Sequence, residues 1–154
     1  MKDTLISDFT NDEFQDAFKL YFKDLEIKVN DWSTLFREMT EEGGNFAYVR
    51  KDGKNEIIGF IMFRADQLSN WFFTENIGFI REFWISEKYR KNGHGSELLR
   101  LAEAFFSERG IKKIILTTDT AEQFYLSHGY IKDSSYSAKN GDDVFIKNII
   151  FYEK

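Results

Sequence analysis

Residues 84–99 constrain the fold more than any other stretch of this 154-residue chain. An apolar segment, 77–85, predicts a strand that ends near Ile85. A basic polar loop and two glycines follow, and apolar side chains then recur at helical spacing, namely Leu98, Leu101, Ala102 and Phe105. A strand therefore leads through a glycine turn into a helix of 95–108, and the chain must mix α and β structure.

The remaining elements follow from periodicity and turn signals. Helices are predicted after the capping residues 10–13 and over 31–42, where Gly43-Gly44 ends the second one. Strands are predicted at 45–50, 56–64 and 113–117, a short helix at 121–128, and two final strands flanking Asn140-Gly141. The predicted order is β-α-α-β-β-β-α-β-α-β-β. It indicates an α+β or mixed α/β fold with a mostly antiparallel sheet, helices on both faces and one crossover, in a single domain of residues 1–154.

Composition excludes several classes of function. A net charge of −5 argues against a nucleic-acid or anionic-membrane partner, whose phosphates attract positive surfaces. The chain has no Cys and only two His, so neither a disulfide nor a metal site is expected. No apolar run has the length of a membrane span and the N-terminus lacks a signal-like apolar region, so we expect a cytoplasmic protein.

The glycine turn itself leaves two interpretations open. Free amides at a helix start, beside glycines and basic side chains, favour an anion such as a phosphate. The turn lacks the third glycine of a dinucleotide fingerprint, where Leu98 stands, and the Lys-Ser/Thr of a nucleotide-hydrolase loop. The other interpretation is a plain loop with a solvated Arg90.

Two motifs resemble those of one known family. Arg90-x-x-Gly93-x-Gly95 after a strand resembles the acetyl-CoA signature of the GCN5-related N-acetyltransferases (GNAT). The later segment 121–130, Ala-Glu-Gln-Phe-Tyr-Leu-Ser-His-Gly-Tyr, is similar to that family's Ala-x-x-x-Tyr-x-x-x-Gly-Phe helix. The resemblance covers about residues 77–130.

The resemblance implies a set of coenzyme-binding residues. The turn would hold the pyrophosphate through backbone amides and positive charge, using Arg90, Lys91, Asn92, Gly93, His94, Gly95 and Ser96. The backbone of Trp84 and Ile85 would pair with the pantetheine arm, while their side chains could equally be core. We expect His94 to be solvated or close to the phosphates rather than a base.

Two further residues are the candidate catalytic groups. Tyr125 matches the family tyrosine that faces the coenzyme sulfur, and its alternative is a buried aromatic on an amphipathic helix. Glu82 is the best candidate for the base, although some family members have their acidic base one residue earlier, where this chain has Arg81. The alternative for Glu82 is an ion pair on the strand face with a neighbouring Lys or Arg.

The function predicted is transfer of an acetyl group from acetyl-CoA to a primary amine by direct attack, without a metal. The acceptor would be a small-molecule or peptide amine, with a small molecule favoured over a protein, and the protein would be a monomer or a homodimer. The alternative function is an acyl-CoA-binding or sensing module of the same fold without turnover. Trp71, Phe72 and Phe73 would fill the core or, alternatively, line the acceptor pocket.

Overall fold

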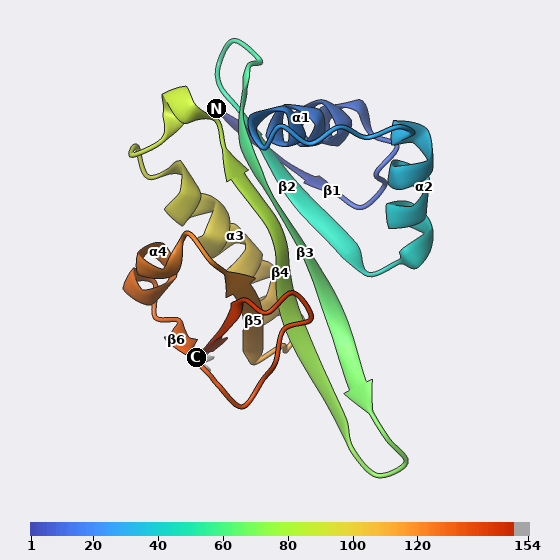
Figure 1. The fold of residues 1–154 in the computed structure, drawn as a ribbon, viewed down its shortest axis with the longest axis vertical. Coiled ribbons are helices and arrows are strands. Elements are labelled where there is room, and N and C mark those ends of the chain that lie inside the picture. The colour runs from blue at the N-terminus through green and yellow to red at the C-terminus, as the bar shows by residue number, and fades with distance from the viewer. Residues whose placement is uncertain (150–154) are drawn as a thin grey trace. The chain divides into compact units, whose positions relative to one another are not determined.

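The computed structural model describes residues 1–149. Its elements follow the predicted order (Figure 1), and they are β1 (Lys2–Ile6), α1 (Asp12–Asp24), α2 (Trp32–Glu42), β2 (Asn45–Lys51), β3 (Ile57–Ser69), β4 (Thr74–Ile85), the 3-10 turn η1 (Glu87–Tyr89), α3 (His94–Glu108), β5 (Lys113–Thr118), α4 (Glu122–Ser127), β6 (Ile131–Lys132) and β7 (Asp143–Asn148). The α+β fold class is therefore confirmed.

The seven strands form one sheet in the order β1-β2-β3-β4-β5-β7-β6. Pairing is antiparallel between β1 and β2, β2 and β3, β5 and β7, and β6 and β7. β4 and β5 are parallel, because the chain returns through helix α3 before it enters β5. The sheet is thus mostly antiparallel. The prediction of one crossover was wrong, because the chain makes a second one from β5 through α4 to β6, with β7 between these two strands.

The chain divides into two compact units. The first comprises residues 1–64 and 81–102, and the second comprises 65–80 and the described chain from Glu103 onward. We describe each unit by itself. The single domain over residues 1–154 stays a prediction.

Aromatic side chains build the core of the first unit. Phe14 and Phe18 of α1 pack against Phe60 of β3, each with ring centroids 5.8 Å apart. Helix α1 begins where the Asn11 carboxamide accepts from the Phe14 amide, so the predicted cap is formed by Asn11. Helix α2 ends at Gly43, whose φ of 71° is unfavourable for residues with a side chain.

The second unit has its own core. Its buried side chains come from α3, β5, α4, the segment between α4 and β6, and β7, and they include Phe106, Ile114, Leu116, Tyr125, Tyr130 and Phe145. Phe106 lies so close to Gly78 of β4 that a Cβ there would be 2.8 Å from the ring. The glycine therefore lets helix α3 approach the sheet.

The aromatic residues 71–73 do not fill the core, so that prediction was wrong. Trp71, Phe72 and Phe73 are 97%, 85% and 75% exposed. Strands β3 and β4 extend beyond their predicted ends, which leaves the aromatic run in the turn of a long hairpin (Figure 1). The Asn70 side chain shapes this turn by accepting from the amides of Phe72 and Phe73, at 2.8 and 2.9 Å. A role in lining the acceptor pocket stays a prediction.

Candidate active site

The turn between β4 and α3 has an unusual backbone. Lys91 and Gly93 both adopt left-handed conformations, with φ of 66° and 84°. The Asn92 side chain donates to the carbonyls of Tyr89 and Arg90, at 3.3 and 3.2 Å, and so braces the turn from within. The Glu97 amide makes the first backbone bond of α3, to the Gly93 carbonyl at 3.1 Å. Helix α3 therefore starts directly at the turn, and its first-turn amides have no acceptor inside the helix.

Arg90 holds this turn against its own unit. Its Nε donates to the carbonyl of Ile85 at 2.8 Å, and its Nη2 lies 3.4 Å from the Asp24 carboxylate at the end of α1. Half of the side chain remains exposed. Arg90 is therefore more than a solvated loop residue, because it links the turn to both the preceding strand and helix α1.

The side chain of Trp84 belongs to the core. It is buried, its ring lies 6.4 Å from that of Phe60, and its Nε1 donates to Asp24 at 2.9 Å. The side chain cannot face a coenzyme, so only the backbone of Trp84 can serve the predicted role. The Ile85 carbonyl accepts from Arg90 and keeps one further lone pair.

Arg50, which the sequence did not single out, anchors the start of α3. Its side chain is 4% exposed. It pairs with Asp3 through two contacts of 2.7 and 2.9 Å, forms an ion pair with Glu97, and lies 3.1 Å from His94 Nδ1. An arginine carries only donors, so Nδ1 of His94 must accept and its lone pair is engaged. This geometry argues against Nδ1 of His94 as a base.

The candidate base Glu82 is paired with a phenol. Tyr21 of α1 donates its hydroxyl to Oε2 of Glu82 at 2.6 Å. Burial raises the pKa of Glu82, while the Tyr21 hydrogen bond and the charge of Arg81 oppose that shift. Within residues 1–149 the hydrogen-bond partner of Glu82 is thus Tyr21, and the predicted alternative of an ion pair with Lys or Arg is not seen. A half-buried carboxylate with a raised pKa is a better proton acceptor than an exposed one.

Tyr125 lies on the buried side of α4. It is 6% exposed and packs edge-on against Phe124 and Tyr130, with ring centroids 5.2 and 5.6 Å away. Burial raises the pKa of Tyr125 to about 12, so the phenol stays neutral near pH 7. Tyr125 belongs to the second unit and the glycine turn to the first, so its role toward the coenzyme stays a prediction.

Two kinds of feature are absent from residues 1–149. No group of three or more His, Asp or Glu side chains in this range is arranged to hold a metal ion. None of the described helices has the length and apolar character needed to cross a membrane.

Comparison with known proteins gives the family. Residues 5–130 match the sequence model of the Acetyltransferase (GNAT) family. No curated protein matches the chain.

Solved structures share the fold. An aminoglycoside 6'-N-acetyltransferase complexed with coenzyme A is 19% identical with a TM-score of 0.70, and the match covers 100% of both chains. A predicted acetyltransferase from Clostridium acetobutylicum, solved with acetyl-CoA, is 17% identical with a TM-score of 0.73, covering 89% of this chain and 94% of that one. A chain of the NatC complex bound to Gag peptide and CoA is 20% identical with a TM-score of 0.68, covering 97% of this chain and 100% of that one.

The family match spans the strand, the glycine turn, helix α3 and helix α4, which are the elements that carry both motifs. The chain therefore belongs to the GNAT family of acetyltransferases.

Proposed function

We propose that the protein binds acetyl-CoA at the turn of residues 90–96 and transfers its acetyl group to a primary amine. The observation that carries the proposal is the pair of left-handed residues, Lys91 and Gly93, at the start of helix α3. Structurally similar proteins solved with CoA or acetyl-CoA support it.

The residues of the turn fit a pyrophosphate. The start of a helix presents its amides and the positive end of its dipole to an anion. Successive amides in a turn with left-handed residues form a concave anion site of the same kind. A Cβ at Gly93 would meet no atom within 4 Å, so this side of the turn is open, and Arg90 and Lys91 add positive charge.

The reaction needs a neutral amine, because an ammonium has no lone pair and its ordinary pKa is about 10.4. Glu82 would take the proton from the ammonium as the acceptor binds. The amine nitrogen then forms a bond to the thioester carbon, and the carbon–sulfur bond breaks. The coenzyme leaves as a thiol after it gains the second proton lost by the nitrogen.

Tyr125 would assist the leaving sulfur. Full proton transfer from a phenol to a thiolate is uphill by roughly 2 kcal/mol at ordinary pKa values. The raised pKa of Tyr125 makes that transfer still less favourable, and it keeps the hydroxyl available as a donor. We therefore propose that Tyr125 donates a hydrogen bond to the sulfur as charge develops.

The acceptor proposed is a small-molecule amine. The similar structures include an enzyme named for a small-molecule acceptor and a complex bound to a peptide, so they support both kinds. Glu82 favours the small acceptor, because its carboxylate is partly buried and already bonded to Tyr21.

The test compares two glycines that both adopt a positive φ. Gly93→Ala and Gly110→Ala both place a side chain at positive φ, 84° and 73°, in open space. Each variant should lose about 1 kcal/mol of stability or slightly more. Calorimetry should show at least about tenfold weaker acetyl-CoA binding for Gly93→Ala, and unchanged binding for Gly110→Ala.

Thiol release across a panel of amines then separates an enzyme from a mere coenzyme-binding module. Wild-type protein should release thiol in an amine-dependent manner. Equal acetyl-CoA affinity in both glycine variants would contradict the proposed site, whereas binding without any amine-dependent release would support the non-catalytic alternative.

A further inference from the structure

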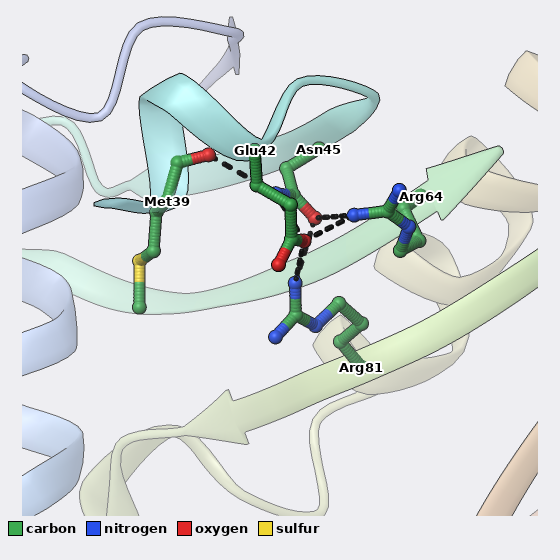
Figure 2. Close-up of polar contacts among 5 residues, drawn as sticks. All are labelled: Met39, Glu42, Asn45, Arg64 and Arg81. Carbon is green, nitrogen blue, oxygen red and sulfur yellow. Dashed lines mark hydrogen bonds and ion pairs between the residues drawn. The ribbon is translucent and has the colours of Figure 1, made fainter. Parts of the chain in front are cut away.

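A second polar cluster lies at the end of helix α2, next to the strand that carries Glu82 (Figure 2). Oε1 of Glu42 accepts from Nη1 of Arg64 and from Nη1 of Arg81, the latter at 2.8 Å. Oδ1 of Asn45 accepts from the same two nitrogens, at 3.3 and 2.8 Å. Two arginines from β3 and β4 thus converge on one carboxylate and one amide.

The cluster is held in place by the backbone. Asn45 is 3% exposed, and its Nδ2 donates to the Met39 carbonyl and to Glu42 Oε1, at 3.1 and 3.0 Å (Figure 2). Asn45 is also the register partner of Arg64 in the β2–β3 ladder. The arginines are therefore positioned by a buried amide rather than by a surface contact alone.

Glu42 carries a negative charge in this cluster, and Arg81 can be reached from solvent. The Asn45 hydrogen bond holds the pKa of Glu42 below its ordinary value, so Glu42 is ionised near neutral pH. The side chain of Arg81 is 30% exposed, so its guanidinium is partly shielded from water but can be reached.

One edge of the Arg81 guanidinium makes no hydrogen bond within the described residues. Every hydrogen bond and ion pair of Arg81 within residues 1–149 is made by Nη1. Its Nε and Nη2 form the other edge of the planar guanidinium, which matches a carboxylate with two parallel hydrogen bonds. A carboxylate can therefore bind there while Glu42 stays on Nη1.

Arg81 directly precedes the candidate base on β4, and its charge acts on the Glu82 carboxylate. Successive side chains of a regular strand point to opposite faces, but Arg81 contacts Glu42 of α2 and Glu82 contacts Tyr21 of α1. Since α1 and α2 pack against each other, both side chains reach the same face of the sheet, and one small molecule can contact both. We propose that the acceptor is an amino acid, with its amine at Glu82 and its carboxylate on the free edge of Arg81. The inference rests on the proposed acetyl transfer and names the substrate class.

A hydrogen-bonded charge pair of this kind contributes about 1.5–3 kcal/mol, which corresponds to roughly 10- to 150-fold in kcat/KM. The test uses α- and ω-amino acids of increasing length, each beside its own carboxamide, with rates corrected for the fraction of neutral amine. We expect wild-type protein to acetylate at least one acid more than about tenfold better than its carboxamide. In Arg81→Gln this ratio should fall to about one.

Arg37→Gln is the matched control, because Arg37 is an exposed arginine of α2 whose ion pair is with Glu41. It should keep the wild-type ratio. The inference is overturned if wild-type protein prefers no acid, or if the preference survives in Arg81→Gln. If Arg81→Gln does not fold, the wild-type ratio alone decides.

Calorimetry with acetyl-CoA distinguishes failure of the proposed function from failure of the proposed substrate class alone. Absent coenzyme binding would overturn the proposed function itself. Coenzyme binding with acetylation of carboxamides or plain amines only would leave the proposed function standing and overturn the acidic acceptor.

Discussion

At the scale of single residues, the contact between Tyr21 and Glu82 sets the pH dependence of the proposed reaction. The Tyr21 hydroxyl stabilises the ionised carboxylate and opposes the effect of burial on the pKa of Glu82. Tyr21→Phe removes this donor, so the pKa of Glu82 should rise further. A base must be ionised to act, and the acid limb of the kcat/KM profile should therefore move to higher pH.

The control for this shift is Tyr136→Phe, which removes a phenol hydroxyl that accepts from Lys113 in the second unit. Its pH profile should match that of wild type. An acid limb that stays in place or moves to lower pH in Tyr21→Phe would contradict the role of Glu82. The stability of the protein depends on pH in the opposite direction to the activity. A carboxyl whose pKa is raised by folding binds more protons in the folded state, so the stability that it contributes is lost as the pH rises.

The sequence indicates some of these residues and not others, for a physical reason. Glu82 and the glycine turn lie in one short stretch beside a recognisable motif, so they can be identified from local sequence. Tyr21 is 61 residues from Glu82, and Arg50 is 47 from Glu97. Such partners meet only through tertiary packing, and the local sequence around an aromatic residue or an arginine does not identify its distant partner.

At the scale of elements, the junction of β3 and β4 depends on one glycine. A Cβ at Gly59 would lie 2.3 Å from the Trp84 carbonyl oxygen and 3.0 Å from the Ile85 Cα. Backbone atoms cannot yield as a flexible side chain can, so Gly59→Ala must move the end of β4. We expect a loss of at least about 2 kcal/mol in urea unfolding, together with weaker acetyl-CoA binding, because β4 leads into the turn.

Gly53→Ala is the comparison, since Gly53 lies in the neighbouring turn with no atom within 4 Å of an added Cβ. Its stability should stay within about 0.5 kcal/mol of wild type. Equal stability of the two variants would show that the strands separate at low cost.

Element positions could be predicted well where periodicity and caps agree, as for α1, α2 and α3. The lengths of β3 and β4 could not. Both continue as far as a turn shaped by Asn70, and the residues beyond the buried part, such as Leu68 and Glu75, have little apolar alternation to reveal a strand. The exposed aromatic turn follows from this misjudged length, because hydrophobicity alone suggests burial.

At the scale of the whole molecule, the order of elements follows from the sequence, because each element has its own local signal. The second crossover, from β5 through α4 to β6, does not follow, because the insertion of β7 between these strands is a long-range pairing. The division into two compact units does not, since it depends on which distant segments pack together. Three elements pass without interruption from one unit into the other, namely β3 (Ile57–Ser69), β4 (Thr74–Ile85) and α3 (His94–Glu108). This continuity favours the prediction that residues 1–154 form a single domain.

Unfolding one unit alone would break two strands and a helix in the middle of their hydrogen-bonded runs, so we expect one cooperative transition. In urea, fluorescence of Trp32 and Trp84, which lie in the first unit, should change together with amide exchange in the β5–β7 ladder of the second. Acetyl-CoA at about 100 times its Kd should raise the free energy of unfolding by about 2.7 kcal/mol as measured by either signal, although its proposed binding turn lies in the first unit. Two separate transitions, or protection confined to the first unit, would mean that the units fold independently, and the coenzyme would then stabilise only the part of the chain that holds the glycine turn.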